Sequence, residues 1–308
     1  MTISFLTEAF GFNFGLLNIV SIILFVVLAP FVGGLLAGID RKLTARMQGR
    51  VGPPILQPFY DVLKLTEKER ITVNRYQDFY MGAFLFFIIL TGVFFFAGGD
   101  LLFVIFALTT ASMFLILAAY SSNSPYAEVG ASRELLQMMA YEPMVLLTAV
   151  GFYMVVGSFS VTNILAATKP AIIYLPGLFI GFVFILTLKF RKSPFDLSMS
   201  HHAHQELVKG LSTEFSGKTL AYMEIAHWYE NVFLLGMVFL FIACAGNVVA
   251  DIIAVVVCLF VYFFETYIDN CFARMRWQTA INSAWIVALV IGFTNIFVLY
   301  FLKLFGIL

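Results

Sequence analysis

Long apolar runs recur along the chain, separated by polar stretches. Each run is near eighteen residues or longer with few charges, the length that an α-helix needs to cross the hydrocarbon core of a bilayer. The runs lack the alternation of membrane β-barrel strands, and a backbone in lipid must satisfy its own hydrogen bonds. The pattern predicts an all-α polytopic membrane protein with eight transmembrane helices, at about residues 15–38, 80–97, 100–120, 136–157, 171–188, 231–249, 251–268 and 280–305.

Composition agrees with this pattern. Of the 308 residues, 61% are hydrophobic and 12% are charged, far outside the range of soluble proteins. Eighteen basic residues balance eighteen acidic ones, so no overall positive field favours nucleic acid as a partner. The start, MTISFLTEAF, lacks the basic stretch of a cleaved signal peptide, so we expect the first run to be retained. We expect residues 1–308 to form a single integral membrane domain.

Lysine and arginine predict the orientation. Sixteen of the eighteen basic residues fall on one side of the predicted membrane, and only Lys169 and Lys303 fall on the other. By the positive-inside rule, the rich side is cytoplasmic, both termini lie outside, and the protein spans the cell membrane several times. Trp228, Tyr229 and Trp277, at predicted span ends on the inner face, are expected at the level of the lipid headgroups. The long inner loops are expected at residues 39–79, 121–135, 189–230 and 269–279.

The first inner loop contains a predicted amphipathic helix that lies in the membrane interface. Apolar residues recur there at helical spacing and are opposed by charged ones. Binding of anionic lipid would explain the lysines without any further function, but an acid gains nothing from such lipid. Asp61 is therefore the residue of this loop that points to function. The apolar residues are Ile55, Leu56, Phe59, Val62 and Leu63, and the charged ones are Asp61, Lys64 and Lys68.

Acidic residues also occur at membrane depth. Glu134, Met138 and Glu142 fall on one face of a helix at i, i+4 spacing, and Pro143 is expected to open that helix locally. An ionisable group inside a membrane span is a functional hypothesis by default, with helix packing as the alternative for Glu142. We expect Arg133 to pair with a carboxylate across the bundle. Glu265 either snorkels to the inner surface or pairs with Arg274.

The stretch 189–217, KFRKSPFDLSMSHHAHQELVKGLSTEFSG, concentrates titratable side chains between two apolar runs. Histidine titrates near neutral pH, and partly desolvated carboxylates can reach that range, so the pattern favours proton handling. A solvated charged loop is the alternative. Zinc binding is a further one, but no HExxH pattern and no nearby thiolate support it. Ser193 and Pro194 suit a helix start. The titratable residues are Asp196, His201, His202, His204, Glu206 and Glu214.

The three cysteines do not form a recognisable metal or redox motif. Cys244, Cys258 and Cys271 are widely spaced in or beside apolar segments, so we expect them to be reduced, buried and structural. An iron–sulfur cluster needs a set of thiolates that this chain does not supply. We therefore expect no cofactor or metal in this chain and place any redox centre in another subunit.

Three stretches resemble one known family. RMQGRVGPPILQPFYDVLKL, GASRELLQMMAYEP and SPFDL followed by QELVKGLSTEFSG are similar to the eight-helix NuoH-type subunit of respiratory complex I and of energy-converting nickel–iron hydrogenases. The resemblance implies a subunit that anchors a cytoplasmic redox arm and begins the coupling of electron transfer to ion translocation. Asp40 falls where the family carries an acid ahead of a basic pair. The family also carries charged residues at the positions of Asp61, Arg133, Glu142, Asp196, Glu206 and Glu214.

The chain departs from the complex I members of this family. The loop that helps to shape the quinone entrance is shortened, because Gly52, Pro53 and Pro54 run almost directly into Leu56 and Gln57. Two glutamates of the third stretch are replaced by histidines, at positions 202 and 204, and Glu134 directly follows Arg133. These departures are more similar to the hydrogenase branch, especially the Ech-type enzymes.

The resemblance implies a proton-coupling subunit of a hydrogenase complex that oxidises ferredoxin and evolves hydrogen. The expected partners are an iron–sulfur small subunit, a nickel–iron large subunit, an antiporter-like membrane subunit and, through the complex, ferredoxin. The nickel–iron centre and the iron–sulfur clusters would lie in those partners, and the isolated chain is expected not to be catalytic. A quinone-site subunit of complex I and a stand-alone cation or proton transporter are the alternatives. No internal repeat of the transporter type is visible.

Overall fold

A computed structural model describes residues 16–69, 74–199 and 209–305. Within these ranges the fold is a helical bundle without β-strands; Asp100 and Ser160 form an isolated bridge. The long helices are α2 (Leu16–Met47), α4 (Arg75–Phe96), α5 (Leu101–Tyr120), α6 (Pro125–Val156), α9 (Gly217–Ile242) and α10 (Val248–Cys271). The last stretch consists of α11 (Trp277–Ile286), the π-helical turn η3 (Val287–Gly292) and α12 (Phe293–Leu304). The short elements are α3 (Gln57–Glu67), α7 (Val161–Leu165), η1 (Ala171–Ile173), α8 (Pro176–Lys189) and η2 (Gly210–Ser212).

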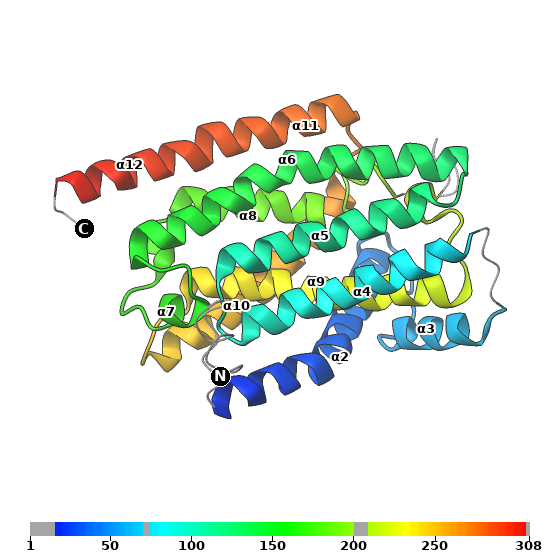
Figure 1. The fold of residues 1–308 in the computed structure, drawn as a ribbon, viewed down its shortest axis with the longest axis horizontal. Helices are drawn as coiled ribbons and strands as arrows, with labels where there is room; N and C mark the ends of the chain where they lie inside the picture. Colours follow the sequence, from blue (N-terminus) through cyan, green and yellow to red (C-terminus); the bar gives the residue numbers. More distant parts are fainter. Residues whose placement is uncertain (1–15, 70–73, 200–208, 306–308) are drawn as a thin grey trace.

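Seven helices in the described residues are long and apolar enough to cross a membrane. The eighth predicted span, 171–188, is the exception, because its helix α8 has only 14 residues. At 1.5 Å per residue α8 is about 21 Å long, short of the ~30 Å hydrocarbon core. Figure 1 shows that α6 ends and α9 begins at opposite ends of the bundle, so α8 and the segment after it still return the chain across it.

Several helices extend into ranges predicted as loops. α2 continues to Met47, α6 begins at Pro125, and α9 begins at Gly217 with a capping box between Ser216 and Thr219. α6 also continues unbroken through Pro143, so the local opening predicted there is wrong. Because polar residues at helical spacing continue a helix beyond its apolar part, hydropathy alone underestimated these lengths.

The core lies around α9. Two thirds of its most apolar stretch (67%) is buried, against 17% for the stretch Trp277–Leu304 at the side of the bundle. Trp228 and Tyr229 are buried in α9, so their predicted place among lipid headgroups is wrong. The Trp228 ring packs against Phe59 of α3, and the Tyr229 hydroxyl donates to the carbonyl of Val26. α9 therefore joins α2 and α3 to the bundle.

After α8 the chain continues without a helix inside the bundle. Pro194, Phe195 and Leu197 are buried, and Ser193 and Pro194 do not start a helix. Buried backbone outside a helix needs hydrogen-bond partners for its polar groups. Side chains of neighbouring helices provide them here: Gln137 of α6 donates to the Phe195 carbonyl at 2.6 Å, and Asp269 of α10 accepts from the Ser193 amide at 2.8 Å.

Glycines allow close contacts between α2 and its neighbours. A Cβ at Gly38 would lie 1.9 Å from the carbonyl oxygen of Ile55, in the loop before α3, and one at Gly33 would lie 2.4 Å from the Trp228 carbonyl oxygen. Backbone atoms cannot move aside as flexible side chains can. α2 and the loop therefore touch at a distance that only glycine permits.

We predict that Gly38→Ala destabilises the protein, because the loop must move away from α2. Gly82→Ala is the matched control, since nothing lies within 4 Å of a Cβ at that position of α4. Alanine there should be neutral or stabilising by up to about 1 kcal/mol. Thermal unfolding in mild detergent measures both effects, and equal stability of the two variants would contradict this description of the α2–loop contact.

Candidate functional site

Three cations of the segment 189–192 reach carboxylates on three different helices. Lys189 Nζ lies 3.1 Å from Glu230 Oε1 of α9, Arg191 Nη2 lies 2.8 Å from Glu134 Oε1 of α6, and Lys192 Nζ lies 2.5 Å from Asp40 Oδ1 of α2. Five of the six side chains are 4–11% exposed, and Asp40 is 25% exposed. We call these six residues the charge network. Because the chain leaves the helix after Lys189, the three cations can point toward different helices.

Lys189 connects two helices through polar contacts. Its Nζ donates to Ser112 Oγ at 3.3 Å and lies 4.5 Å from the centre of the Tyr141 ring. Glu142 follows Tyr141 in α6, and the positive charge of Lys189 acts on its carboxyl group. It is half-buried and forms no ion pair within the described ranges, whereas Glu134 and Met138 of the predicted acidic face are buried. Glu142 thus borders the charge network rather than belonging to an ion pair.

Arg191 is held from two sides. Its Nε and Nη2 both donate to the Glu134 carboxylate, and its Nη1 lies 2.6 Å from His227 Nε2. A guanidinium cannot accept a hydrogen bond, so His227 accepts at Nε2 and is the neutral tautomer with its proton on Nδ1. Burial lowers the pKa of Arg191, but the carboxylates of Glu134 and Glu230 raise it above its ordinary value. Arg191 is therefore a fixed positive charge.

Lys192 and Asp40 share a third partner on α10. Thr266 Oγ1 donates to Asp40 Oδ1 at 2.6 Å and accepts from Lys192 Nζ at 3.1 Å. The lysine ammonium also lies 5.3 Å from the centre of the Tyr262 ring. Asp40, Lys192 and Thr266 therefore form one hydrogen-bonded group that joins α2, α10 and the segment after α8.

Asp61 lies at the surface end of this arrangement. Arg41, which follows Asp40 on α2, donates from Nη1 to Asp61 Oδ2 at 2.6 Å, and Gln57 donates to Oδ1 at 2.8 Å. Partial burial raises the pKa of Asp61, but these hydrogen bonds and the charge of Arg41 outweigh it and hold that pKa below its ordinary value. With both side chains about 40% exposed, this pair adds at most about 1 kcal/mol of stability.

The other predicted residues lie apart from the charge network. Asp196 pairs with Arg274 at 3.3 Å, and Arg133 and Arg274 both donate to the Leu197 carbonyl, beside a cavity of about 430 Å³. Glu214 is half-buried, and its carbonyl accepts from Gln77. His202, His204 and Glu206 lie outside the described ranges, so the prediction for the histidine stretch stays a prediction.

Two further predictions are wrong. Cys244 and Cys258 are buried as expected, but Cys271 is exposed because it ends α10 beyond the apolar part of that helix. Glu265 neither snorkels nor pairs with Arg274, since it is 0% exposed and Arg274 pairs with Asp196.

Sequence reasoning missed five important residues. The basic residues Lys189, Arg191 and Lys192 served only to predict orientation, and Glu230 and His227 were not considered. Their signal is present: three basic residues directly follow an apolar run, and Glu230 directly precedes one. Charged residues at the ends of different apolar runs, such as Lys189 and Glu230, are therefore candidates for ion pairs with one another.

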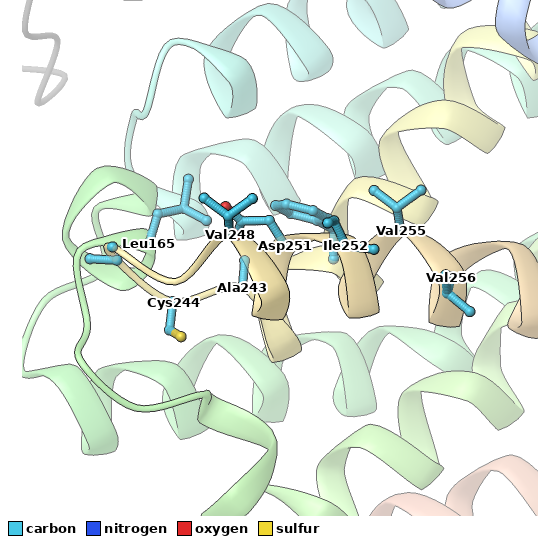
Figure 2. A pocket seen from close by; sticks show the side chains of 11 residues that line it. Leu165, Ala243, Cys244, Val248, Asp251, Ile252, Val255 and Val256 are labelled. Atoms are coloured by element: carbon cyan, nitrogen blue, oxygen red, sulfur yellow. The ribbon is translucent and has the colours of Figure 1, made fainter.

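A hollow of about 610 Å³ lies at the N-terminal end of α10, and no ion pair like those of the charge network is found among its lining residues. It is lined mostly by apolar side chains, among them Leu165, Val248, Ile252 and Val255, with Asp251 as its charged residue (Figure 2). The charge network lies near the opposite end of α10. The hollow therefore does not contribute to the candidate site.

Known proteins are similar to this chain over most of its length. The family described as NADH dehydrogenase matches residues 19–300. The H subunit of NADH-quinone oxidoreductase from Bacillus cytotoxicus is 31% identical over 320 residues, covering 92% of each chain. Hydrogenase-4 component C of Escherichia coli is 28% identical over 281 residues, covering 82% of this chain and 87% of its own. A chain in the solved structure of a membrane-bound sulfane sulfur reductase, an archaeal respiratory membrane complex, matches with a TM-score of 0.79 and 27% identity, covering 90% of this chain and 99% of its own.

We predict that Lys189→Met destabilises the folded bundle by about 3–5 kcal/mol, because it leaves Glu230 as an uncompensated buried charge. Lys42→Met is the matched control, since Lys42 is exposed. Denaturant unfolding in detergent measures the difference. A change below about 1 kcal/mol for Lys189→Met would contradict the buried ion pair.

Proposed function

The chain belongs to the NADH dehydrogenase family, and from this membership and the charge network we propose that it is the ion-coupling membrane subunit of an energy-converting nickel–iron hydrogenase. Such a complex oxidises reduced ferredoxin, evolves hydrogen and moves ions across the cell membrane. The observation that carries this proposal is the buried set of three ion pairs held by residues 189–192. Buried pairs are weak evidence for stability, so their number in one bundle supports a functional role.

The coupling step is electrostatic. An electron on an iron–sulfur cluster of a neighbouring redox subunit would act through its charge on the carboxylates and lysines of the charge network. At an effective dielectric constant of about 20, two unit charges about 15 Å apart have an interaction energy of about 1 kcal/mol. That energy corresponds to nearly one pKa unit, which is enough to move a proton between groups of similar affinity. The redox centre must therefore dock close to the end of the bundle that carries this network.

The redox centres would belong to partner subunits. Cys244 lies between α9 and α10, Cys258 lies within α10 and Cys271 ends α10, and no group of cysteines that could hold a metal occurs among the described residues. We assign the iron–sulfur clusters to a small hydrogenase subunit and the nickel–iron centre to a large one, with ferredoxin as the electron donor. An antiporter-like membrane subunit would continue the ion path. The inner side, with the cytoplasmic ends of the helices, is where the redox subunits would attach.

A quinone-site subunit of respiratory complex I is the second candidate. The similarity to the H subunit of NADH-quinone oxidoreductase supports it. We favour the hydrogenase because the loop that helps to shape the quinone entrance in complex I is shortened here, and its residue Ile55 lies directly against Gly38 of α2. A stand-alone transporter, the third alternative, would purify alone. In the hydrogenase this chain co-purifies with nickel and iron–sulfur proteins, whereas isolation with a quinone-reducing complex that lacks nickel would contradict the proposal.

We predict that Glu142→Gln leaves the complex assembled but lowers ion transfer coupled to hydrogen evolution at least tenfold. Glu142 borders the charge network, and the glutamine amide that replaces its carboxyl cannot bind and release a proton. Glu128→Gln, at an exposed position of the same helix, is the matched control and should behave as the wild type. Ion uptake by sealed vesicles is measured together with hydrogen production. Unchanged ion pumping in Glu142→Gln would contradict a role for this carboxyl.

A further inference from the structure

Glu265 of α10 is a buried carboxyl without a hydrogen-bond partner. It is 0% exposed, and neither carboxylate oxygen has a partner within residues 16–69, 74–199 and 209–305. The other buried glutamates, Glu134 and Glu230, each pair with a cation at about 3 Å. Unpartnered ionised carboxylates are strongly disfavoured in a protein interior, where burying an isolated charge costs far more than burying a neutral polar group. Glu265 therefore carries its proton in this state.

The surroundings of Glu265 also favour the neutral form. The charges that act on it are those of Lys192, from the segment after α8, and Asp269, one helical turn further along α10. Lys192 is already paired with Asp40 of α2, and Asp269 accepts from the Ser193 amide. Ionised Glu265 would therefore compete with Asp40 for Lys192 and would be repelled by the Asp269 carboxylate.

The position of Glu265 connects it to the charge network. Its neighbour on α10 is Thr266, whose hydroxyl contacts both Asp40 and Lys192. Glu265 thus stands beside the one ion pair of the network whose acid is partly exposed, since Asp40 is 25% exposed and Lys192 only 8%. Asp40 therefore reaches the surface of the described bundle, while Glu265 lies in its closed interior.

We infer that Glu265 is a second proton-holding carboxyl, which exchanges its proton with the Asp40–Lys192 pair; this inference rests on the proposed function. In the transfer, the proton leaves the Glu265 carboxyl and binds the Asp40 carboxylate. The Lys192 ammonium turns from Asp40 to the newly formed Glu265 carboxylate. One bond to hydrogen breaks and one forms, and the total charge of the group does not change. The interior therefore never holds an unpaired charge, and the reverse exchange reloads Glu265.

The direct test is infrared spectroscopy of the purified complex combined with ion uptake by vesicles. Wild-type protein should show the C=O stretching band of a protonated carboxylic acid that shifts in heavy water, and Glu265→Gln should lose it. Glutamine fits because the site already holds a neutral group of this shape. Glu265→Gln should evolve hydrogen in detergent as the wild type does, but should transfer at least tenfold fewer ions per hydrogen evolved in vesicles. Glu128→Gln, on an exposed position of α6, should match the wild type in every measurement.

The outcomes separate this inference from the proposed function. If the wild-type complex pumps ions and Glu265→Gln pumps equally well, Glu265 is not on the path and only this inference fails. Retention of the carboxylic acid band in Glu265→Gln also overturns it. If the wild-type complex evolves hydrogen without moving ions, the proposed function fails, and the transfer role of Glu265 fails with it. Should Glu265→Gln not assemble, Glu265→Asp, which keeps a carboxyl, is expected to assemble and pump, and failure to pump would overturn the exchange.

Discussion

The central constraint in this structure is the buried charge of the segment 189–192, whose cations must each find a carboxylate on one of three helices. Helix α8 stops short of the bilayer thickness, and the chain after it must remain inside the bundle to satisfy its backbone. There its cations join α2, α6 and α9 at one level of the bundle. The end of α8 and the buried charges belong together, because the chain leaves the helix at Lys189 and the three cations then reach three different helices.

Most of the helical architecture could be predicted from the sequence, whereas the ion pairs could not. Apolar runs located seven helices of spanning length, and the sequence also named Glu134 and, through the family resemblance, Asp40 as candidate residues. Helix limits were less certain, because α6 and α9 continue into polar sequence where hydropathy gives no signal. The partners of the acids depend on which helices pack together, and that is a tertiary property. No spacing along the chain connects Asp40 to Lys192, 152 residues away.

The arrangement of charges explains how the chain can hold ionisable groups inside its helix bundle, because each cation has a carboxylate as its partner. Replacing a buried ion pair by apolar residues is often neutral or stabilising, so stability alone does not retain three such pairs. Their retention is understandable if protons or cations move among them when a nearby redox centre changes charge.

The central claim is that the ion pairs serve ion transfer rather than folding. Its most direct test replaces both members of one pair, Lys189→Met together with Glu230→Leu, and measures folding stability and ion uptake in the same complex. We predict a complex at least as stable as the wild type, with hydrogen evolution in detergent retained and ion uptake by vesicles lowered at least tenfold. Wild-type ion uptake by the double variant would contradict the account.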